Sequence, residues 1–71
     1  MFKAAVVSIE VAQNLIVIKT LISNGAPVGA TVDSLNYKEV VGCVAGDDTL
    51  LVVTHSIQEA TVVAARLQEL L

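Results

Sequence analysis

Four short segments rich in β-branched residues, arranged as two closely spaced pairs, constrain the fold of this chain most strongly. The first pair is residues 3–10 and 14–20, and the second pair is residues 40–46 and 49–54. β-Branched runs of this length favour strands. Because only a few residues separate the members of each pair, each pair predicts an antiparallel hairpin.

A helical pattern follows each predicted hairpin. The first helix is expected to begin at Ser23 or Asn24, either of which can act as an N-cap, and to end near Asn36. Its apolar stripe consists of Val28, Val32 and Leu35. The second helix opens with the capping box Ser56-Ile57-Gln58-Glu59 and continues with apolar residues at helical spacing.

The order of these elements predicts an α+β domain, β-β-α-β-β-α, with a four-stranded antiparallel sheet and two helices on one face. Residues 1–71 are expected to form a single domain. The strand at 14–20 contains four consecutive apolar residues, Leu15 to Ile18, which is typical of a strand with both faces covered. Two helices cover one face, so we expect the second face to meet another subunit.

Composition supports self-association. With 71 residues, one cysteine and one histidine, the chain cannot form an internal disulfide or a zinc site of four Cys and His ligands. Its residues are 55% hydrophobic and 15% charged. Because a core this small gives limited stability, oligomerisation is the remaining means of stabilisation.

Charge and hydropathy exclude several classes of partner. A net charge of −3 offers no basic surface for nucleic acid, and no apolar run approaches the length of a membrane helix. The first residues do not resemble a secretory signal. Together with the free thiol, these features predict a cytoplasmic protein.

Polar chemistry concentrates at Asp47 and Asp48, which directly follow Gly46. The simpler interpretation is a tight hairpin turn exposed to solvent. The alternative is a ligand site, because two adjacent carboxylates near a subunit interface would require a cation. A guanidinium satisfies that requirement best, since its planar donors match a carboxylate bidentately.

The remaining candidates for chemistry are isolated. His55 precedes the last helix without a catalytic partner at a recognisable spacing, and Cys43 is expected to be a small buried hydrophobe. Asp33 is either a surface charge or a second carboxylate facing a ligand. The segment from Gly25 to Gly29 does not match a phosphate-binding loop. We therefore predict no catalytic residues, no metal ligands and no cofactor.

The segment Val44-Ala45-Gly46-Asp47-Asp48-Thr49, preceded by Asp33-Ser34-Leu35, resembles the C-terminal domain of bacterial arginine repressors over about residues 6–71. The resemblance implies trimers that pair into hexamers, with L-arginine as corepressor at the interface between trimers. It further implies which residues bind the ligand. These are Asp47 and Asp48 at the cationic groups, with Asp33, Cys43 and the Ala45 backbone lining the pocket.

Two features depart from that family. Its members place Gln or His at the start of the first helix, where this chain has Ala26, so one ligand contact is lost. The family's N-terminal winged-helix DNA-binding domain is absent from these 71 residues. We therefore expect an arginine-binding oligomerisation domain whose DNA contacts belong to another domain. A pure oligomerisation module, a sensor of another amino acid and, least favoured, a small enzyme remain alternatives.

Overall fold

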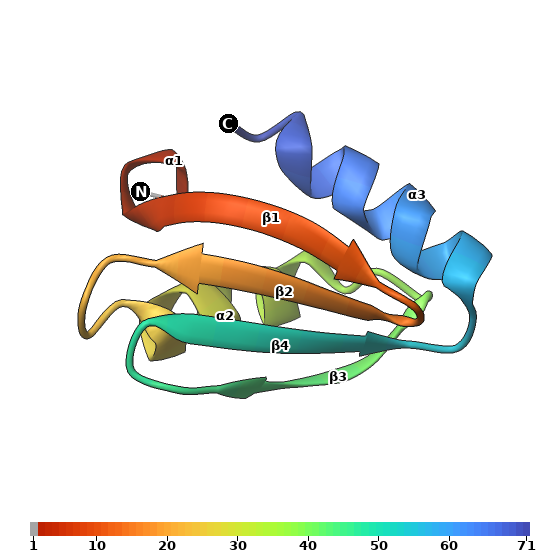
Figure 1. The fold of residues 1–71 in the computed structure, drawn as a ribbon, viewed down its shortest axis with the longest axis horizontal. Coiled ribbons are helices and arrows are strands. Elements are labelled where there is room, and N and C mark those ends of the chain that lie inside the picture. Colours follow the sequence, from red (N-terminus) through yellow and green to blue (C-terminus); the bar gives the residue numbers. More distant parts are fainter. Residues whose placement is uncertain (1) are drawn as a thin grey trace.

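The strands form one antiparallel sheet in the order β1-β2-β4-β3, which confirms the predicted α+β fold (Figure 1). The computed structural model describes residues 2–71. Its elements are α1 (Phe2–Ala5), β1 (Val6–Ala12), β2 (Leu15–Thr20), α2 (Gly25–Leu35), β3 (Val40–Ala45), β4 (Thr49–Thr54) and α3 (Ile57–Gln68). Apart from α1, the element order is the predicted β-β-α-β-β-α.

The start of the chain differs from the prediction. Residues 2–5 form the short helix α1, and the first strand begins at Val6 instead of residue 3. Lys3, Ala4 and Ala5 are good helix formers, and the β-branched run starts only at Val6. Phe2 is buried in the core, so α1 contributes an aromatic side chain to it.

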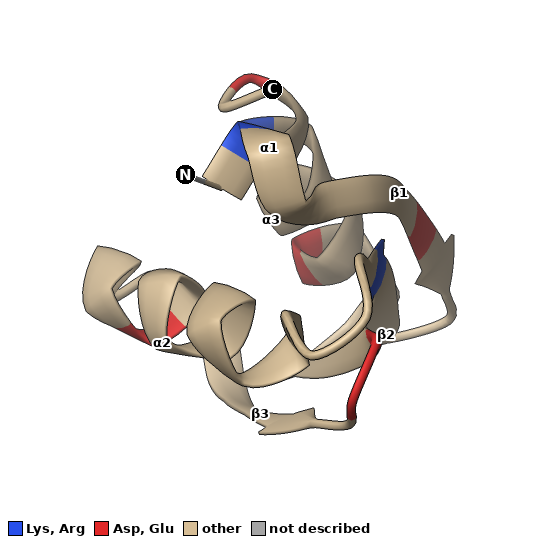
Figure 2. Ribbon diagram, turned by 90° about the vertical axis from the view of Figure 1, so that its left-hand side faces the viewer, with Lys and Arg blue, Asp and Glu red and all other residues tan. Residues whose placement is uncertain are grey.

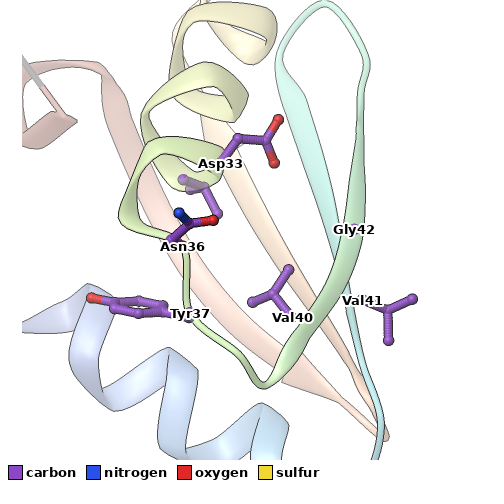
Figure 3. A pocket seen from close by; sticks show the side chains of 7 residues that line it. Asp33, Asn36, Tyr37, Val40, Val41 and Gly42 are labelled. Atoms are coloured by element: carbon purple, nitrogen blue, oxygen red, sulfur yellow. The ribbon is translucent and has the colours of Figure 1, made fainter.

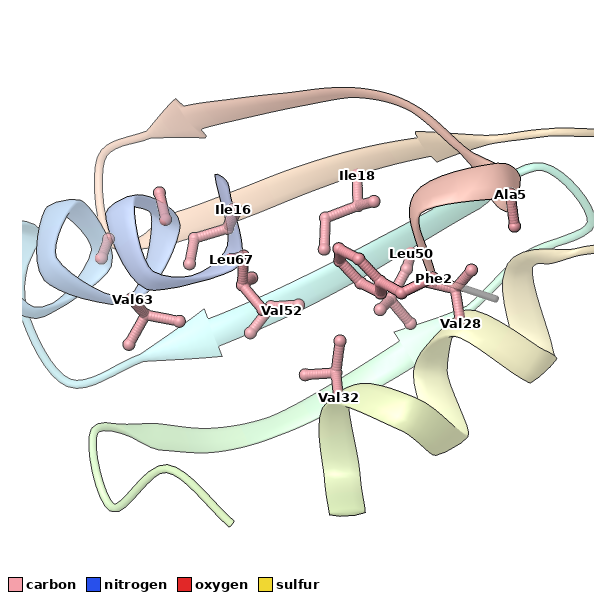
Figure 4. Close-up of a cluster of buried hydrophobic side chains, with 12 residues drawn as sticks. Phe2, Ala5, Ile16, Ile18, Val28, Val32, Leu50, Val52, Val63 and Leu67 are labelled. Atoms are coloured by element: carbon pink, nitrogen blue, oxygen red, sulfur yellow. The ribbon is translucent and has the colours of Figure 1, made fainter. Parts of the chain in front are cut away.

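Residues of β2 and β4 alternate strictly between the two faces of the sheet. Ile16 and Ile18 of β2 and Leu50 and Val52 of β4 are fully buried beneath the helices (Figure 4). The buried residues of α2 and α3 complete this core, and they are Val28, Val32, Ala60, Val63, Ala64 and Leu67. Both long helices therefore cover the same face, as predicted.

The opposite surface of the sheet, called here the open face, is also apolar. Leu15 and Val17 of β2 pair with Val53 and Leu51 of β4, and these four side chains are only half-buried. Val44 of β3 lies opposite Leu51 on the same face and is 69% exposed. None of the helices described in residues 2–71 covers this face. The second subunit expected there stays a prediction.

The ends of the two long helices are fixed in different ways, and Asn24, one of the two predicted N-caps of α2, makes no side-chain capping hydrogen bond. Asn36 ends α2 in the left-handed conformation, with φ 56°. Ser56 Oγ accepts a hydrogen bond from the Glu59 backbone N–H at 3.1 Å, which confirms one half of the predicted capping box. The α3 residue Arg66 donates to Glu39 Oε1 at 3.0 Å, which ties this helix to the segment before β3.

Candidate functional site

The acidic turn between β3 and β4 is held by backbone hydrogen bonds to two other elements. The backbone N–H of Thr20, at the end of β2, donates to the Asp48 carbonyl at 2.8 Å. The N–H of Gly25, at the start of α2, donates to the Asp47 carbonyl at 3.0 Å. The turn itself is closed by Gly46 N–H and the Thr49 carbonyl, 2.7 Å apart. Both carboxylates are thus presented from a fixed backbone.

The Asp47 carboxylate faces the loop between β2 and α2. Its Oδ2 accepts a hydrogen bond from the Ser23 backbone N–H at 3.3 Å, and its Oδ1 lies 3.5 Å from Ser23 Oγ. Ser23 adopts the left-handed conformation, with φ 68°. Asp47 is therefore both an exposed anion and an anchor for the loop.

The Asp48 carboxylate faces the sheet instead. Its Oδ1 accepts a hydrogen bond from Thr49 Oγ1 at 3.0 Å and lies 3.9 Å from Lys19 Nζ. Lys19 Nζ also donates to Thr49 Oγ1 at 2.9 Å. Figure 2 shows the acidic turn beside the basic end of β2. The two adjacent carboxylates thus have different neighbours.

Asp33, Cys43 and Ala45 lie along the seam between α2 and β3. Cys43 Sγ donates to Asp33 Oδ1 at 3.3 Å and lies 4.0 Å from the Gly29 carbonyl oxygen. Ala45 also borders Gly29, since a Cβ built on that glycine would lie 3.8 Å from the Ala45 Cβ. A Cβ on Gly29 would also lie only 3.0 Å from Leu50 Cδ1, so the absence of a side chain there allows α2 to pack closely on β4. The structure therefore gathers three of the five predicted residues along one seam.

The surroundings of Cys43 make its thiol a weak acid. Burial raises the pKa of Cys43 to about 11, and the hydrogen bond and negative charge of Asp33 act in the same direction. Cys43 is half-buried and not fully enclosed as predicted. Since the thiolate is the nucleophilic form, this thiol is poorly suited to covalent chemistry near neutral pH.

A cavity of about 180 Å³ opens at the other end of the seam (Figure 3). Its lining consists of Val32, Asp33, Asn36, Tyr37, Val40, Val41 and Gly42. Of the residues predicted to bind a ligand, only Asp33 borders it. Asp33 therefore stands between this cavity and the part of the seam that contains Cys43.

Some neighbours of the acidic turn were not predicted from the sequence. Lys19 and Ser23 both contact its carboxylates, yet they lie more than twenty residues earlier in the chain. The pairing of Lys19 with Thr49 follows from the register of β2 against β4. A correct pairing of the two hairpins would have revealed Lys19. The left-handed Ser23 has no comparable sequence signal.

Other kinds of site are not found in the described part of the chain. No group of three or more His, Cys, Asp or Glu residues within residues 2–71 could hold a metal ion. None of the helices described there is long and apolar enough to span a membrane. His55 is exposed and lies 3.3 Å from Glu59, as expected for a histidine in a solvated loop.

Comparison with known proteins identifies relatives over nearly the whole chain. A family model described as "Arginine repressor, C-terminal domain" matches residues 2–69. The arginine repressor of Koribacter versatilis is 42% identical over 66 residues, which are 93% of this chain and 45% of that protein. The arginine repressor of Exiguobacterium sibiricum is 44% identical over 61 residues, 86% of this chain and 41% of that protein.

A third relative, the arginine repressor of Halalkalibacterium halodurans, is 42% identical over 65 residues, 92% of this chain and 44% of that protein. The chain thus spans less than half the length of these curated relatives. The matched residues 2–69 span all four strands and include the Gly-Asp-Asp-Thr turn. The chain belongs to the family of arginine repressor C-terminal domains.

Proposed function

We propose that this chain is the effector-binding and oligomerisation domain of an arginine-responsive transcriptional regulator. L-Arginine is the proposed corepressor, bound between two trimers of a hexamer. The observation that carries the proposal is the fixed, exposed pair Asp47 and Asp48 in a member of this family. Relatives named arginine repressor support the ligand class.

The chemistry of the acidic turn supports a guanidinium ligand. Asp48 Oδ2 accepts no hydrogen bond within residues 2–71, so an acceptor remains available beside an oxygen that is already engaged. A guanidinium offers several donors in one plane and keeps its charge at all physiological pH values. Charge-assisted hydrogen bonds of this type are the strongest available to an exposed carboxylate.

The open face supports the proposed self-association. Leu15, Val17, Leu51 and Val53 form a continuous apolar surface that a second copy of the chain would cover. Burial of such surface contributes about 25 cal/mol per Å² of apolar area. A domain of this size gains from that contribution, because its own core is small. DNA contact is assigned to an N-terminal winged-helix domain outside these 71 residues.

One alternative is favoured by a specific observation. Asp47 already contacts Ser23, and Asp48 already contacts Lys19, so the turn has a structural use without any ligand. This is the arrangement expected of a pure oligomerisation module. A sensor of another amino acid is the further alternative, because Ala26 brings no polar side chain to the first turn of α2.

Calorimetric titration with L-arginine and L-citrulline tests the proposal. Citrulline has nearly the same shape but is uncharged at the ureido end, so we expect arginine to bind and citrulline to bind far more weakly. Replacing Asp48 by Asn removes a charge partner, which costs on the order of 2–5 kcal/mol of affinity when the pair is desolvated.

Glu69→Gln is the matched control, because it removes one exposed carboxylate at the end of α3. Light scattering on the same samples measures the mass of the assembly. Binding and assembly are reciprocal, so arginine is expected to increase the hexameric fraction. Equal responses to arginine and citrulline, or an Asp48→Asn variant that binds like the control, would contradict the proposal.

A further inference from the structure

Lys19 stands out on the open face, where it is a charged side chain at the end of an apolar strand. It lies in register with Thr49 of the neighbouring strand β4. Its side chain is 50% exposed, and that of Asp48 is 52% exposed. Both charged groups are therefore accessible to a ligand from solvent, and both side chains can change rotamer.

Three contacts connect Lys19 to the acidic turn. Lys19 Nζ donates to Thr49 Oγ1 at 2.9 Å, and the same hydroxyl donates to Asp48 Oδ1 at 3.0 Å. The ammonium lies 3.9 Å from that carboxylate oxygen. The hydroxyl of Thr49 thus links the two charges, and Lys19 is the counter-ion of Asp48. Asp47 instead faces Ser23.

We propose that Lys19 is a tethered competitor for Asp48 that lowers the affinity of the site for every cationic ligand that must displace it. The inference rests on the function proposed above, because it concerns the cationic ligand of that turn. Because Lys19 belongs to the same chain, its ammonium loses no translational entropy when it pairs with Asp48. A free cation must therefore interact with Asp48 more favourably than Lys19 does.

The chemistry of the two cations determines the outcome of this competition. A ligand ammonium would replace one flexible point charge by another and would form no better-aligned hydrogen bonds to Asp48. A guanidinium can form two parallel hydrogen bonds to one carboxylate, which the Lys19 ammonium cannot do. Asp48 Oδ2, which accepts no hydrogen bond within residues 2–71, offers the second acceptor. Displacing Lys19 costs both ligands the same free energy, so a guanidinium, with its second hydrogen bond, can offset that cost and an ammonium cannot.

The test compares L-arginine and L-lysine on the wild type and on Lys19→Met, which removes the charge but keeps most of the apolar stem. We expect arginine affinity to rise roughly two- to fivefold, the range of a surface ion pair. The lysine affinity is expected to rise by the same factor and to stay below that of arginine, because both ligands displace the same competitor. Lys38→Met, an exposed residue between α2 and β3, controls for the change in net charge.

The same titrations in an Asp48→Asn background identify the partner of Lys19. There the gain from Lys19→Met should disappear, because no carboxylate remains for which to compete. A gain that persists in that background, together with a changed mass in light scattering, would assign the effect to assembly and overturn the inference. Unchanged or weaker binding by Lys19→Met would also overturn it. If neither the wild type nor Lys19→Met binds arginine, the proposed function fails and the inference fails with it.

Discussion

At the scale of single residues, the Cys43 thiol shows how the α2–β3 seam controls reactivity. Burial raises its pKa to about 11, and Asp33 adds to the shift through a hydrogen bond and its negative charge. The usual pKa of a thiol is 9.0. At pH 8 the thiolate fraction is therefore lower by roughly a hundredfold than for an unperturbed thiol.

The low thiolate fraction can be measured as a low rate of alkylation. We expect iodoacetamide to alkylate native Cys43 slowly at pH 8, with a rate that keeps rising beyond pH 10 because the thiolate forms only there. Asp33→Asn should accelerate the reaction several-fold and move its midpoint to lower pH, since a negative charge beside the thiol is removed. Asp48→Asn, which changes a carboxylate outside the seam, should leave the rate unaltered. Mass spectrometry of quenched samples measures the alkylated fraction over time. Equal rates for both variants would contradict this account.

The candidate residues were predicted from the sequence to different degrees. Asp47 and Asp48 could be identified from the sequence because Gly and Asp are residues that favour a turn. The proximity of Asp33 to Cys43 depends on the packing of α2 against β3. Sequence patterns specify that helix but not its position along the strand, so the seam itself could not be derived. The ligand assignment at these residues stays a prediction.

At the scale of elements, α2 meets the acidic turn backbone to backbone. The N–H of Gly25 donates to the Asp47 carbonyl at 3.0 Å. A methyl group on Gly25 would overlap the carbonyl oxygen of Gly46. The start of α2 can lie this close to the turn only because Gly25 has no side chain.

Gly25→Ala should therefore separate the helix from the turn or strain both. We expect a loss of about 1–3 kcal/mol in the free energy of unfolding, the usual cost of inserting a methyl group into a filled space. Gly42→Ala is the matched control, since a Cβ there would meet nothing within 4 Å. Urea unfolding of the two variants gives the comparison. A Gly25→Ala protein as stable as Gly42→Ala would refute the close contact.

Most elements could be predicted because their signals are local. The capping box at Ser56 depends on neighbouring residues alone, and its hydrogen bond from the Glu59 N–H to Ser56 Oγ is confirmed. The short helix α1 was missed because four residues carry too little periodicity to distinguish a helix turn from a strand start. Its stability comes from Phe2, whose burial between α2 and the sheet is a tertiary contact (Figure 4).

At the scale of the whole molecule, the two faces of the sheet have different surroundings, because the helices described in residues 2–71 cover only one of them. The run from Leu15 to Ile18 showed that both faces are apolar, but an unbroken apolar run does not reveal which residues face the helices. The structure assigns Ile16 and Ile18 to the core and Leu15 and Val17 to the open face. Neighbouring residues of one strand can therefore test the two faces separately.

We expect Val17→Asp to give a folded protein of smaller mass, because its charge lies on the proposed subunit interface and can be solvated in the monomer. Ile18→Asp should unfold the domain, since its charge would be buried without a partner beneath the helices. Circular dichroism reports the fold, and sedimentation equilibrium reports the mass. A Val17→Asp protein that retains the mass of the wild type would show that copies of the chain do not associate through the open face.

Each long helix follows one hairpin in the chain but covers the other in space. α2 follows β1 and β2 yet packs chiefly on β3, whereas α3 follows β3 and β4 and makes its largest sheet contact with β1. The central strands β2 and β4 come from different hairpins. A cut at residues 37–39 would therefore give two fragments, each bearing the helix that shields the strands of the other. Neither fragment could bury its own apolar strands, so the pair should fold only on mixing, and the domain should melt in a single step.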